Sequence, residues 1–436
     1  MPRFPLTALL VLLVGCSPAA GPEPPPDVVV VTIDTLRADH LGGYGYPRET
    51  SPNLDALAAS GVRFEACRAP MATTLPSHLS LFTGTHPLRH GVLANRVGDS
   101  IYERDPGLIT LAEELREAGY TTGAFVSAFV LRRDAGLAAG FDRYDEPAGA
   151  ERPGHRTLER ALSWWSEAGP GPRFLWVHLF EPHGPYEPPD HLASLFAGDR
   201  IAGPVLRDRH ISDAMNQRLL LNDYDREVRH ADELVGQLLD EVGEEVVLLI
   251  VADHGEGLWQ HGWKGHGFLW EEQLRVPAIL HAPGLEPRVE SRPHSISDLA
   301  PLLLDLLPAV EGGSVRRQSS RTREILGQGH LALAAVKDPE APPLLRTAWT
   351  EGRWSLMRIE ERSGEGVRRS LFDLSRDGIQ VRDLAERETD HTARLEESML
   401  EAASTLIEER GGRRRDATEL ELRQLEALGY GGSADD

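Results

Sequence analysis

The chain of 436 residues carries a formal net charge of −22 and contains two cysteines, Cys16 and Cys67. Its length accommodates one large domain with an appendage, and two cysteines do not make a disulfide framework. The acidic balance excludes nonspecific binding to nucleic acid, which depends on Lys and Arg side chains that neutralise phosphates. Any anionic substrate must therefore be held by a local site.

The N-terminal segment has the features of a secreted lipoprotein. A positively charged start precedes the apolar run 6–14, which is too short to span a membrane. The run ends in Leu13-Val-Gly-Cys16, which resembles the bacterial lipobox, whose Cys is acylated. We expect a signal peptide over 1–16, a lipid on Cys16 and a Pro-rich tether over 17–27. This places the protein on a membrane of the bacterial envelope, the outer one because Ser17 follows the Cys, facing the periplasm or the exterior. The alternative is a signal peptide cut nearby without lipid.

The first buried strand and a helix after it frame the candidate chemistry. Residues 27–34 form a β-branched apolar run, which predicts a strand buried on both faces of a mainly parallel sheet and ending in Asp34. Ligands of α/β proteins bind at that carboxyl edge. Residues 71–84 predict a loop that turns into a helix, with Thr74 as N-cap and Pro76 in the first turn. A hydroxyl at a helix N-terminus favours an anionic substrate and an oxygen nucleophile, although an ordinary capped helix is the alternative.

Helical and extended patterns then alternate along the chain, which predicts an α/β fold with a large, mainly parallel mixed sheet flanked by helices. We expect helices over 51–61, 110–118, 156–167, 216–242 and 298–307, strands over 173–180, 245–252 and 270–280, and a short buried strand with its exit over 122–130.

The composition changes towards the C-terminus. Residues 312–343 are rich in Gly, Ser, Arg and Pro, which predicts an irregular crossing from a catalytic domain over 28–340. Patterns over 346–359 and 368–374 predict antiparallel strands around a turn, and the pattern over 390–409 predicts a packing helix, in a smaller C-terminal α+β subdomain over 341–436. The basic cluster 410–415 is interpreted as a solvated end.

Polar residues follow the buried strands. The strand 245–252 ends in Asp253 and His254. The sheet would bring these residues to Asp34, opposite the Thr74 helix. Three oxygens and one imidazole predict a site for one divalent cation: Mg²⁺, Ca²⁺ or Mn²⁺, with Zn²⁺ as an alternative.

The sequence resembles the sulfatase family of the alkaline phosphatase superfamily from about Val28 to Tyr430. The motifs that carry the resemblance are Val-Thr-Ile-Asp-Thr-Leu-Arg-Ala-Asp-His-Leu41, Ser-Pro-Asn-Leu-Asp-Ala-Leu-Ala58, Leu-Pro-Ser-His-Leu-Ser-Leu-Phe-Thr-Gly84, Tyr-Asp-Arg-Glu-Val-Arg-His-Ala-Asp232, Asp-His-Gly-Glu256, Glu-Glu-Gln-Leu-Arg-Val-Pro277, Leu-Phe-Asp-Leu374 and Leu-Glu-Ala-Leu-Gly-Tyr430. The resemblance implies an alkaline phosphatase-like fold and a metal-dependent ester hydrolase.

Several positions depart from the family pattern. The family nucleophile opens a Cys/Ser-x-Pro-x-Arg motif and is converted to formylglycine, whereas Thr74 stands here and cannot yield an aldehyde. His78 replaces the arginine of that motif, and Thr35 replaces a second metal aspartate. The lysine and histidine of a Gly-Lys-x-His pattern are absent from 126–129.

The resemblance assigns the remaining roles. Two histidines fall where the family places substrate-contacting groups, and they would steady the substrate oxygens or protonate the leaving oxygen. The implied metal ligands are Asp34, Thr74, Asp253 and His254; the implied catalytic residues are Thr74, His183 and His266; and the implied substrate-binding residues are His78, Lys264, His183 and His266.

An unmodified threonine is the nucleophile in related phosphodiesterase and lipid-headgroup phosphotransferase branches. We therefore expect hydrolysis or transfer of a phosphate monoester or diester of a small molecule, glycan or lipid headgroup. One alternative is a sulfatase acting on a sulfated glycan or an aryl or alkyl sulfate, although sulfothreonine lacks the collapse that releases sulfate from formylglycine. A second alternative is a degenerate protein that binds an anionic glycan without turnover, against which the retained Asp34, Asp253 and His254 weigh.

Overall fold

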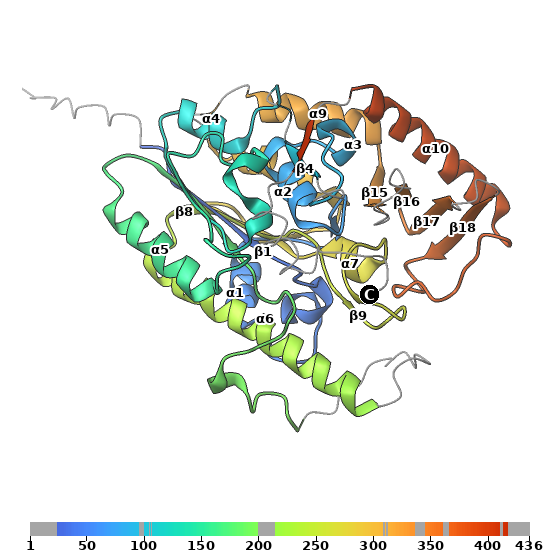
Figure 1. Ribbon diagram of the computed structural model, residues 1–436, viewed down its shortest axis with the longest axis horizontal. Helices are drawn as coiled ribbons and strands as arrows, with labels where there is room; N and C mark the ends of the chain where they lie inside the picture. Colours follow the sequence, from blue (N-terminus) through green and yellow to red (C-terminus); the bar gives the residue numbers. More distant parts are fainter. Residues whose placement is uncertain are drawn as a thin grey trace, which may run out of the picture.

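A computed structural model describes residues 24–95, 100–103, 105, 107–198, 214–307, 310, 313–335, 345–360, 366–409 and 413–416 (Figure 1). The predicted sheet is its centre, with eight strands. Their order across the sheet is β13 (Arg288–Glu290), β2 (Val62–Phe64), β12 (Ala278–His281), β8 (Val246–Ala252), β1 (Asp27–Ile33), β7 (Arg173–Leu179), β5 (Thr121–Phe125) and β6 (Arg143–Asp145).

The sheet is mixed, as the sequence predicted. Strands β8, β1, β7, β5 and β6 are parallel neighbours, whereas β12 runs antiparallel between β8 and β2. Ile33 of β1 lies beside Ala252 of β8. Because these strands end together, Asp34 and Asp253 leave the sheet side by side at its carboxyl edge.

Helices cover both faces of the sheet (Figure 1). One face carries α1 (Pro52–Ser60), α5 (Gly154–Glu167) and α6 (Ala214–Val242), and α6 packs against both of the others. The other face carries α2 (Thr74–Thr83), α3 (Pro87–His90), α4 (Leu111–Glu117), α8 (Leu299–Leu304) and α9 (Ser314–Leu326). The expected helices and strands outside the exceptions below are confirmed to within a few residues.

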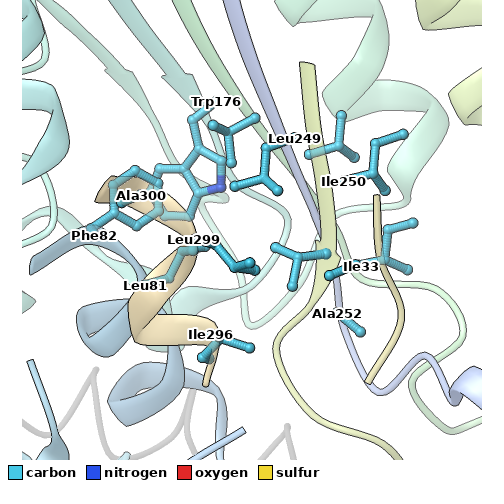
Figure 2. Packing of buried hydrophobic residues seen from close by; sticks show 14 of the residues in the cluster. Ile33, Leu81, Phe82, Trp176, Leu249, Ile250, Ala252, Ile296, Leu299 and Ala300 are labelled. Carbon is cyan, nitrogen blue, oxygen red and sulfur yellow. The ribbon is translucent and has the colours of Figure 1, made fainter. Parts of the chain in front are cut away.

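Helix α2 lies inside the protein rather than on its surface, since all ten of its residues are buried. Figure 2 shows Leu81 and Phe82 of α2 beside Leu299 of α8 and Trp176 of β7. The rings of Phe82 and Trp176 are 4.5 Å apart between centroids. Each fully buried side chain of this size contributes about 1.5–3 kcal/mol, so the packing fixes α2, and with it Thr74, against the sheet.

The C-terminal unit is a smaller antiparallel sheet with one helix, which confirms the predicted α+β subdomain (Figure 1). Its elements are β15 (Gly329–Ala335), β16 (Leu345–Glu351), β17 (Trp354–Glu360), β18 (Val367–Asp373) and α10 (Thr389–Glu408). The sheet begins upstream of residue 341, where we placed the start of the subdomain. The proposed domain boundaries stay a prediction.

The prediction of an irregular crossing over 312–343 was wrong for its described part, which holds α9 and β15. Its Arg and Ser residues hid an amphipathic helix whose Val315 and Leu326 are buried. The buried Gln318 side chain holds this helix against the end of α2 and the segment before α4, because its Nε2 donates to the carbonyl oxygens of Thr83 and Ile109.

The prediction of one strand over 270–280 was also wrong. The segment contains α7 (Glu271–Leu274), then β11 (Arg275–Val276) and β12. Glu271 is held by a two-bond ion pair with Arg68, and Pro277 has no N–H for a sheet and separates the two strands. Strand β11 pairs with β3 (Cys67–Arg68), next to β14 (His294–Ser295), whereas β12 joins the main sheet.

The remaining elements are short. They are η1 (Ala38–His40), η2 (Gly42–Tyr44), η3 (Phe129–Leu131), η4 (Arg133–Ala135), η5 (Asp190–Leu192), η6 (Ile296–Asp298), β4 (Ser100–Glu103), β9 (Gly257–Leu258), β10 (Lys264–Gly265) and β19 (Arg413–Asp416). Strand β19 pairs with β4, so part of the basic cluster 410–415 is a paired strand, and its interpretation as a solvated end stays a prediction. Within the described ranges, no helix has both the length and the apolar character needed to cross a bilayer. Cys16 lies outside the described residues.

Candidate active site

Three side chains meet where strands β1 and β8 end. Asp34, Asp253 and His254 each offer a ligand atom within 4.8 Å of the others, and each residue is at most 2% exposed. The Nε2 atom of His254 lies 3.4 Å from Asp253 Oδ2 and 3.8 Å from Asp34 Oδ1. Both carboxylate oxygens of Asp34 and Oδ2 of Asp253 are buried without a hydrogen-bond partner in the described chain. The predicted cluster is thus assembled.

The orientation of the His254 ring determines which of its nitrogen atoms faces the two carboxylates. Its Nδ1 lies 3.0 Å from the carbonyl oxygen of Gly255. A carbonyl only accepts hydrogen bonds, so Nδ1 carries the proton and Nε2 presents a lone pair to the two carboxylates. Lone pairs that converge in this way repel one another unless a cation lies between them.

The pKa shifts of these three residues also indicate that a cation is required between them. Burial raises the pKa of Asp34 well above its ordinary value, and burial together with the Asp34 charge does the same for Asp253. Burial lowers the pKa of His254 to about 3. Two ionised carboxylates are therefore stable here only with added positive charge. The donor set of carboxylate oxygens and one neutral imidazole fits a divalent cation.

Thr74 points its hydroxyl towards this cluster. Its Oγ1 lies 3.4 Å from His254 Nε2. The prediction that Thr74 is the N-cap was wrong: Thr74 is the first helical residue, and the extended Thr73 precedes it as the N-cap without a side-chain cap bond. The Thr74 hydroxyl is consequently not engaged in capping its own helix and is available to the strand-end site.

A directed chain of hydrogen bonds supports the Thr74 backbone from the core. Trp176 Nε1 donates to Thr32 Oγ1 at 3.0 Å. His78 Nδ1 lies 2.8 Å from the carbonyl oxygen of Thr74 and must carry the proton, so the Thr32 hydroxyl donates to His78 Nε2, also at 3.0 Å. Burial lowers the pKa of His78 well below its ordinary value, which keeps this tautomer neutral. These contacts favour a positioning role for His78 over the predicted substrate contact.

Sequence reasoning missed a second supporting histidine, His178. Its Nδ1 accepts from the backbone N–H of Ser127, so its protonated Nε2 faces Asp34 Oδ2 at 3.5 Å. His178 lies beside Thr32 in the pairing of β7 with β1. Both residues are polar interruptions of apolar strands, and that pattern was the available signal.

The turn after Asp34 is clamped by Tyr224, which opens one of the family-like motifs but to which the sequence assigned no role in the site. Thr35 adopts a left-handed backbone with φ of 55°, which is costly for a β-branched residue. The Tyr224 hydroxyl donates to the carbonyl oxygen of Thr35 and accepts from the N–H of Arg37. The Thr35 N–H donates to Asp253 Oδ1. The strained turn therefore links the two carboxylates.

The opposite side of the site is built by loops. His183 follows β7, and His266 follows β10; their Nε2 atoms are 3.3 Å apart. The His266 ring also lies against the His254 ring, with centroids 4.4 Å apart. Lys264 is more exposed and stands over the ring of Tyr186, whose hydroxyl contacts Glu256. The structure thus brings the predicted residues to one place, whereas their catalytic and binding roles stay predictions.

Comparisons with known proteins agree with the family resemblance found in the sequence. A family model described as Sulfatase matches residues 26–309. Arylsulfatase A of Homo sapiens is 27% identical over 371 residues, which cover 70% of this chain and 68% of that protein. The crystal structure of phosphonate monoester hydrolase of Agrobacterium radiobacter has a TM-score of 0.70 at 18% identity and covers 87% of this chain and 96% of its own. A structure in complex with its substrate D-glucosamine-2-N,6-O-disulfate has a TM-score of 0.72 at 15% identity, covering 88% and 98%. At these identities the two structural likenesses concern the fold.

Proposed function

Because the chain belongs to the sulfatase family of ester hydrolases, we propose that it is a metal-dependent phosphoesterase whose nucleophile is the unmodified Thr74 hydroxyl. The substrate would be a phosphate monoester or diester of a small molecule, a glycan or a lipid headgroup. The reaction is hydrolysis, or transfer when an alcohol replaces water. One divalent cation, Ca²⁺, Mn²⁺, Mg²⁺ or Zn²⁺, completes the strand-end site.

The observation that carries this proposal is the side chain at the start of α2. Thr74 Oγ1 lies 3.4 Å from His254 Nε2. A threonine cannot be oxidised to the aldehyde on which formylglycine chemistry depends. Its alkoxide, however, is a competent nucleophile towards phosphorus.

The proposed reaction assigns a separate role to each group of site residues. Asp34, Asp253 and His254 would hold the cation, whose positive charge stabilises a deprotonated Thr74 oxygen and the phosphoryl oxygens. Thr74 Oγ forms a bond to phosphorus as the bond to the alcohol oxygen breaks, and the alcohol leaves protonated. Water then attacks phosphorus, the Oγ–P bond breaks, and the hydroxyl is restored. His183 and His266 act on the side of the leaving oxygen, and Lys264 attracts the anionic ester at the rim.

Sulfate-ester hydrolysis is the second candidate. The family match and the likeness to a protein crystallised with a disulfated glucosamine favour a sulfated glycan as its substrate. Sulfothreonine would have to be cleared by direct attack of water, because it has no carbonyl form through which sulfate is expelled. That difficulty ranks this candidate second.

Matched esters of one alcohol separate the two candidates. Phosphate monoester, phosphodiester and sulfate ester of the same aryl alcohol are assayed with the parent, Thr74→Ser and Thr74→Ala. We expect the phosphate esters to be favoured, Thr74→Ser to retain substantial activity and Thr74→Ala to lose it. A clear preference for the sulfate ester would overturn the phosphoryl assignment while leaving the cation site intact.

We also propose that the mature protein is anchored through a lipid on Cys16 to a bacterial envelope membrane. The support is the sequence 13–16 after an apolar run, followed by the Pro-rich tether. Mass spectrometry of the mature N-terminus should find acylated Cys16. An unmodified Cys16, or a start elsewhere, would contradict the anchor.

A further inference from the structure

One aromatic side chain stands exposed close to the active site. Among the exposed large apolar side chains of the described residues, Trp263 alone is aromatic, and it is 42% exposed. The other four lie on β13, on α10 or after β18. A single exposed apolar residue is ordinary in itself. The surroundings of Trp263 are what make it a candidate for ligand binding.

The backbone around Trp263 is held in place by local hydrogen bonds. Trp263 closes the turn between β9 and β10, where its carbonyl oxygen accepts from the N–H of Trp259 at 3.0 Å. In the same turn, the Leu258 N–H donates to Gln260 Oε1. The indole is therefore presented on an ordered hairpin, and a ligand that covers it would lose little affinity to the ordering of this segment.

A second ring supports the indole from the side. Phe268 lies against Trp263, with ring centroids 4.7 Å apart, and the Arg346 guanidinium of β16 stands 5.3 Å from the Phe268 centroid. The N–H of Phe268 donates to Gln273 Oε1, which fixes this residue as well. Trp263 keeps its exposure despite this support. The two rings therefore form a fixed aromatic platform with one open side.

The platform adjoins His266, one of the proposed catalytic residues. Three residues of chain, at most about 11 Å, separate Trp263 from His266. The His266 ring lies 4.4 Å from the ring of His254 in the strand-end site. Gly267, between His266 and Phe268, has a φ of 109°, and no atom outside the adjacent residues lies within 4 Å of the position that a β-carbon would take there. The chain thus leaves space beside the histidine.

We propose that Trp263 and Phe268 bind the alcohol part of the ester, and that this alcohol carries a six-membered ring with an apolar face. The face of an indole attracts a flat apolar ring, and its N–H is available to a ring hydroxyl. A pyranose and an aryl group both have this chemistry, whereas a linear lipid headgroup does not. The inference rests on the proposed function, because it takes the ligand to be the ester itself.

Esters of three alcohols of matched acidity test this assignment. The alcohols are a pyranoside, a benzyl alcohol and a linear alkyl alcohol, and each is supplied as a phosphate ester and as a sulfate ester. We expect the parent to favour a ring-bearing alcohol by at least about 10-fold in kcat/KM. Trp263→Ala should lose this preference through a higher KM, and Trp263→Phe should keep most of it. The ring-bearing ester that loses more identifies the ring as a sugar or as an aryl group.

The matched control is Val289→Ala, since Val289 is 50% exposed on the edge strand β13. It should reproduce the parent preference. If none of the esters were turned over, calorimetric titration with phosphonate analogues of the same three alcohols would measure the same differences as Kd, in the parent and in Trp263→Ala.

Equal values for ring-bearing and linear alcohols, or a preference that Trp263→Ala retains, would overturn the proposal. Failure of the phosphoryl preference, or of Thr74 as the nucleophile, is recognised separately. It would change which acid ester is cleaved and how fast, but not the ratio between alcohols.

Discussion

Three parallel strands of the main sheet end at a buried aspartate. These aspartates differ in whether positively charged side chains surround the carboxylate. Asp145, the last residue of β6, receives hydrogen bonds from Arg143, Arg152 and Arg160. Burial alone would raise its pKa, but the bonds from Arg160 and Arg152 lower it to about 2. At the ends of β1 and β8, Asp34 and Asp253 have no arginine or lysine partner within the described chain, and their pKa values are raised.

This difference distinguishes a structural carboxylate from a functional one. The charge of Asp145 is compensated by the fold itself, so the residue needs nothing from outside. Asp34 and Asp253 have only backbone N–H groups and neutral histidines around them in the described fold, so their two charges together call for a bound cation. The same edge of one sheet therefore carries both kinds of site.

The largest expected effect follows from removing an uncompensated carboxylate. Asp34→Asn or Asp253→Asn should lower activity by at least about 10³-fold and reduce bound metal, because each removes a charged ligand. The metal-free variants should unfold at the same or a higher temperature than the metal-free parent, since a repulsive buried charge is gone. Metal analysis, turnover and thermal unfolding measure this.

The matched control is Asp27→Asn, at the opposite end of β1, where the carboxylate pairs with Arg173. It should leave metal content and turnover unchanged. If Asp34→Asn and Asp253→Asn kept full metal occupancy and normal rates, the strand-end site would be wrong.

The loop histidines should matter next. His183→Ala and His266→Ala should slow esters with poor leaving groups by about 10²-fold and activated aryl esters much less, because these side chains serve the leaving oxygen. A plot of log kcat against leaving-group pKa should become steeper, whereas His191→Ala should reproduce the parent slope. An unchanged slope in both variants would remove the histidines from this role.

A smaller effect is expected at His78. His78→Asn keeps a donor near the position of Nδ1 and should retain most activity, whereas His78→Gln places its amide nearer to Nε2 and should lose about 10-fold in kcat with little change in KM. If the two variants behaved alike, the bond to the Thr74 carbonyl oxygen would not be what positions the nucleophile.

Asp145→Asn should affect the site least. We expect no change in metal content or turnover and a loss of about 2 kcal/mol in the free energy of unfolding, since its arginines are partly solvated. The folded pKa of about 2 lies below the ordinary value of 3.8. The stabilisation is therefore present above about pH 4 and is lost as the pH falls through 2. Denaturant titrations across this range test the sign, and a metal-dependent loss would erase the contrast with Asp34.

The sequence predicted the aspartates at the strand ends better than it predicted the residues that hold them in place. Asp34 and Asp253 each terminate an apolar run, and this pattern alone placed both at the sheet edge. Thr32 and His178 interrupt such runs, but nothing in one strand reveals that its partner across the ladder carries a second polar residue. The clamp by Tyr224 depends on where α6 crosses the sheet, which helical periodicity does not specify.

The same limit explains the errors in the fold. Helix α9 was hidden because its Arg and Ser residues resemble a linker until the buried side of the helix is known. The prediction of a strand over 270–280 was wrong because Glu271 forms an ion pair with Arg68, which is far away in the sequence. This ion pair favours a helical turn. Local patterns therefore identified most elements, whereas long-range partners decided the exceptions.

Covalent trapping tests whether Thr74 is the nucleophile. The parent is incubated with a slowly turned-over phosphodiester, quenched in acid and digested, and the adduct is located by tandem mass spectrometry, with Thr74→Ala as the matched sample. We expect added phosphoryl mass on Thr74 and none in the variant. An adduct on Thr73 instead, or parental turnover by folded Thr74→Ala, would contradict it.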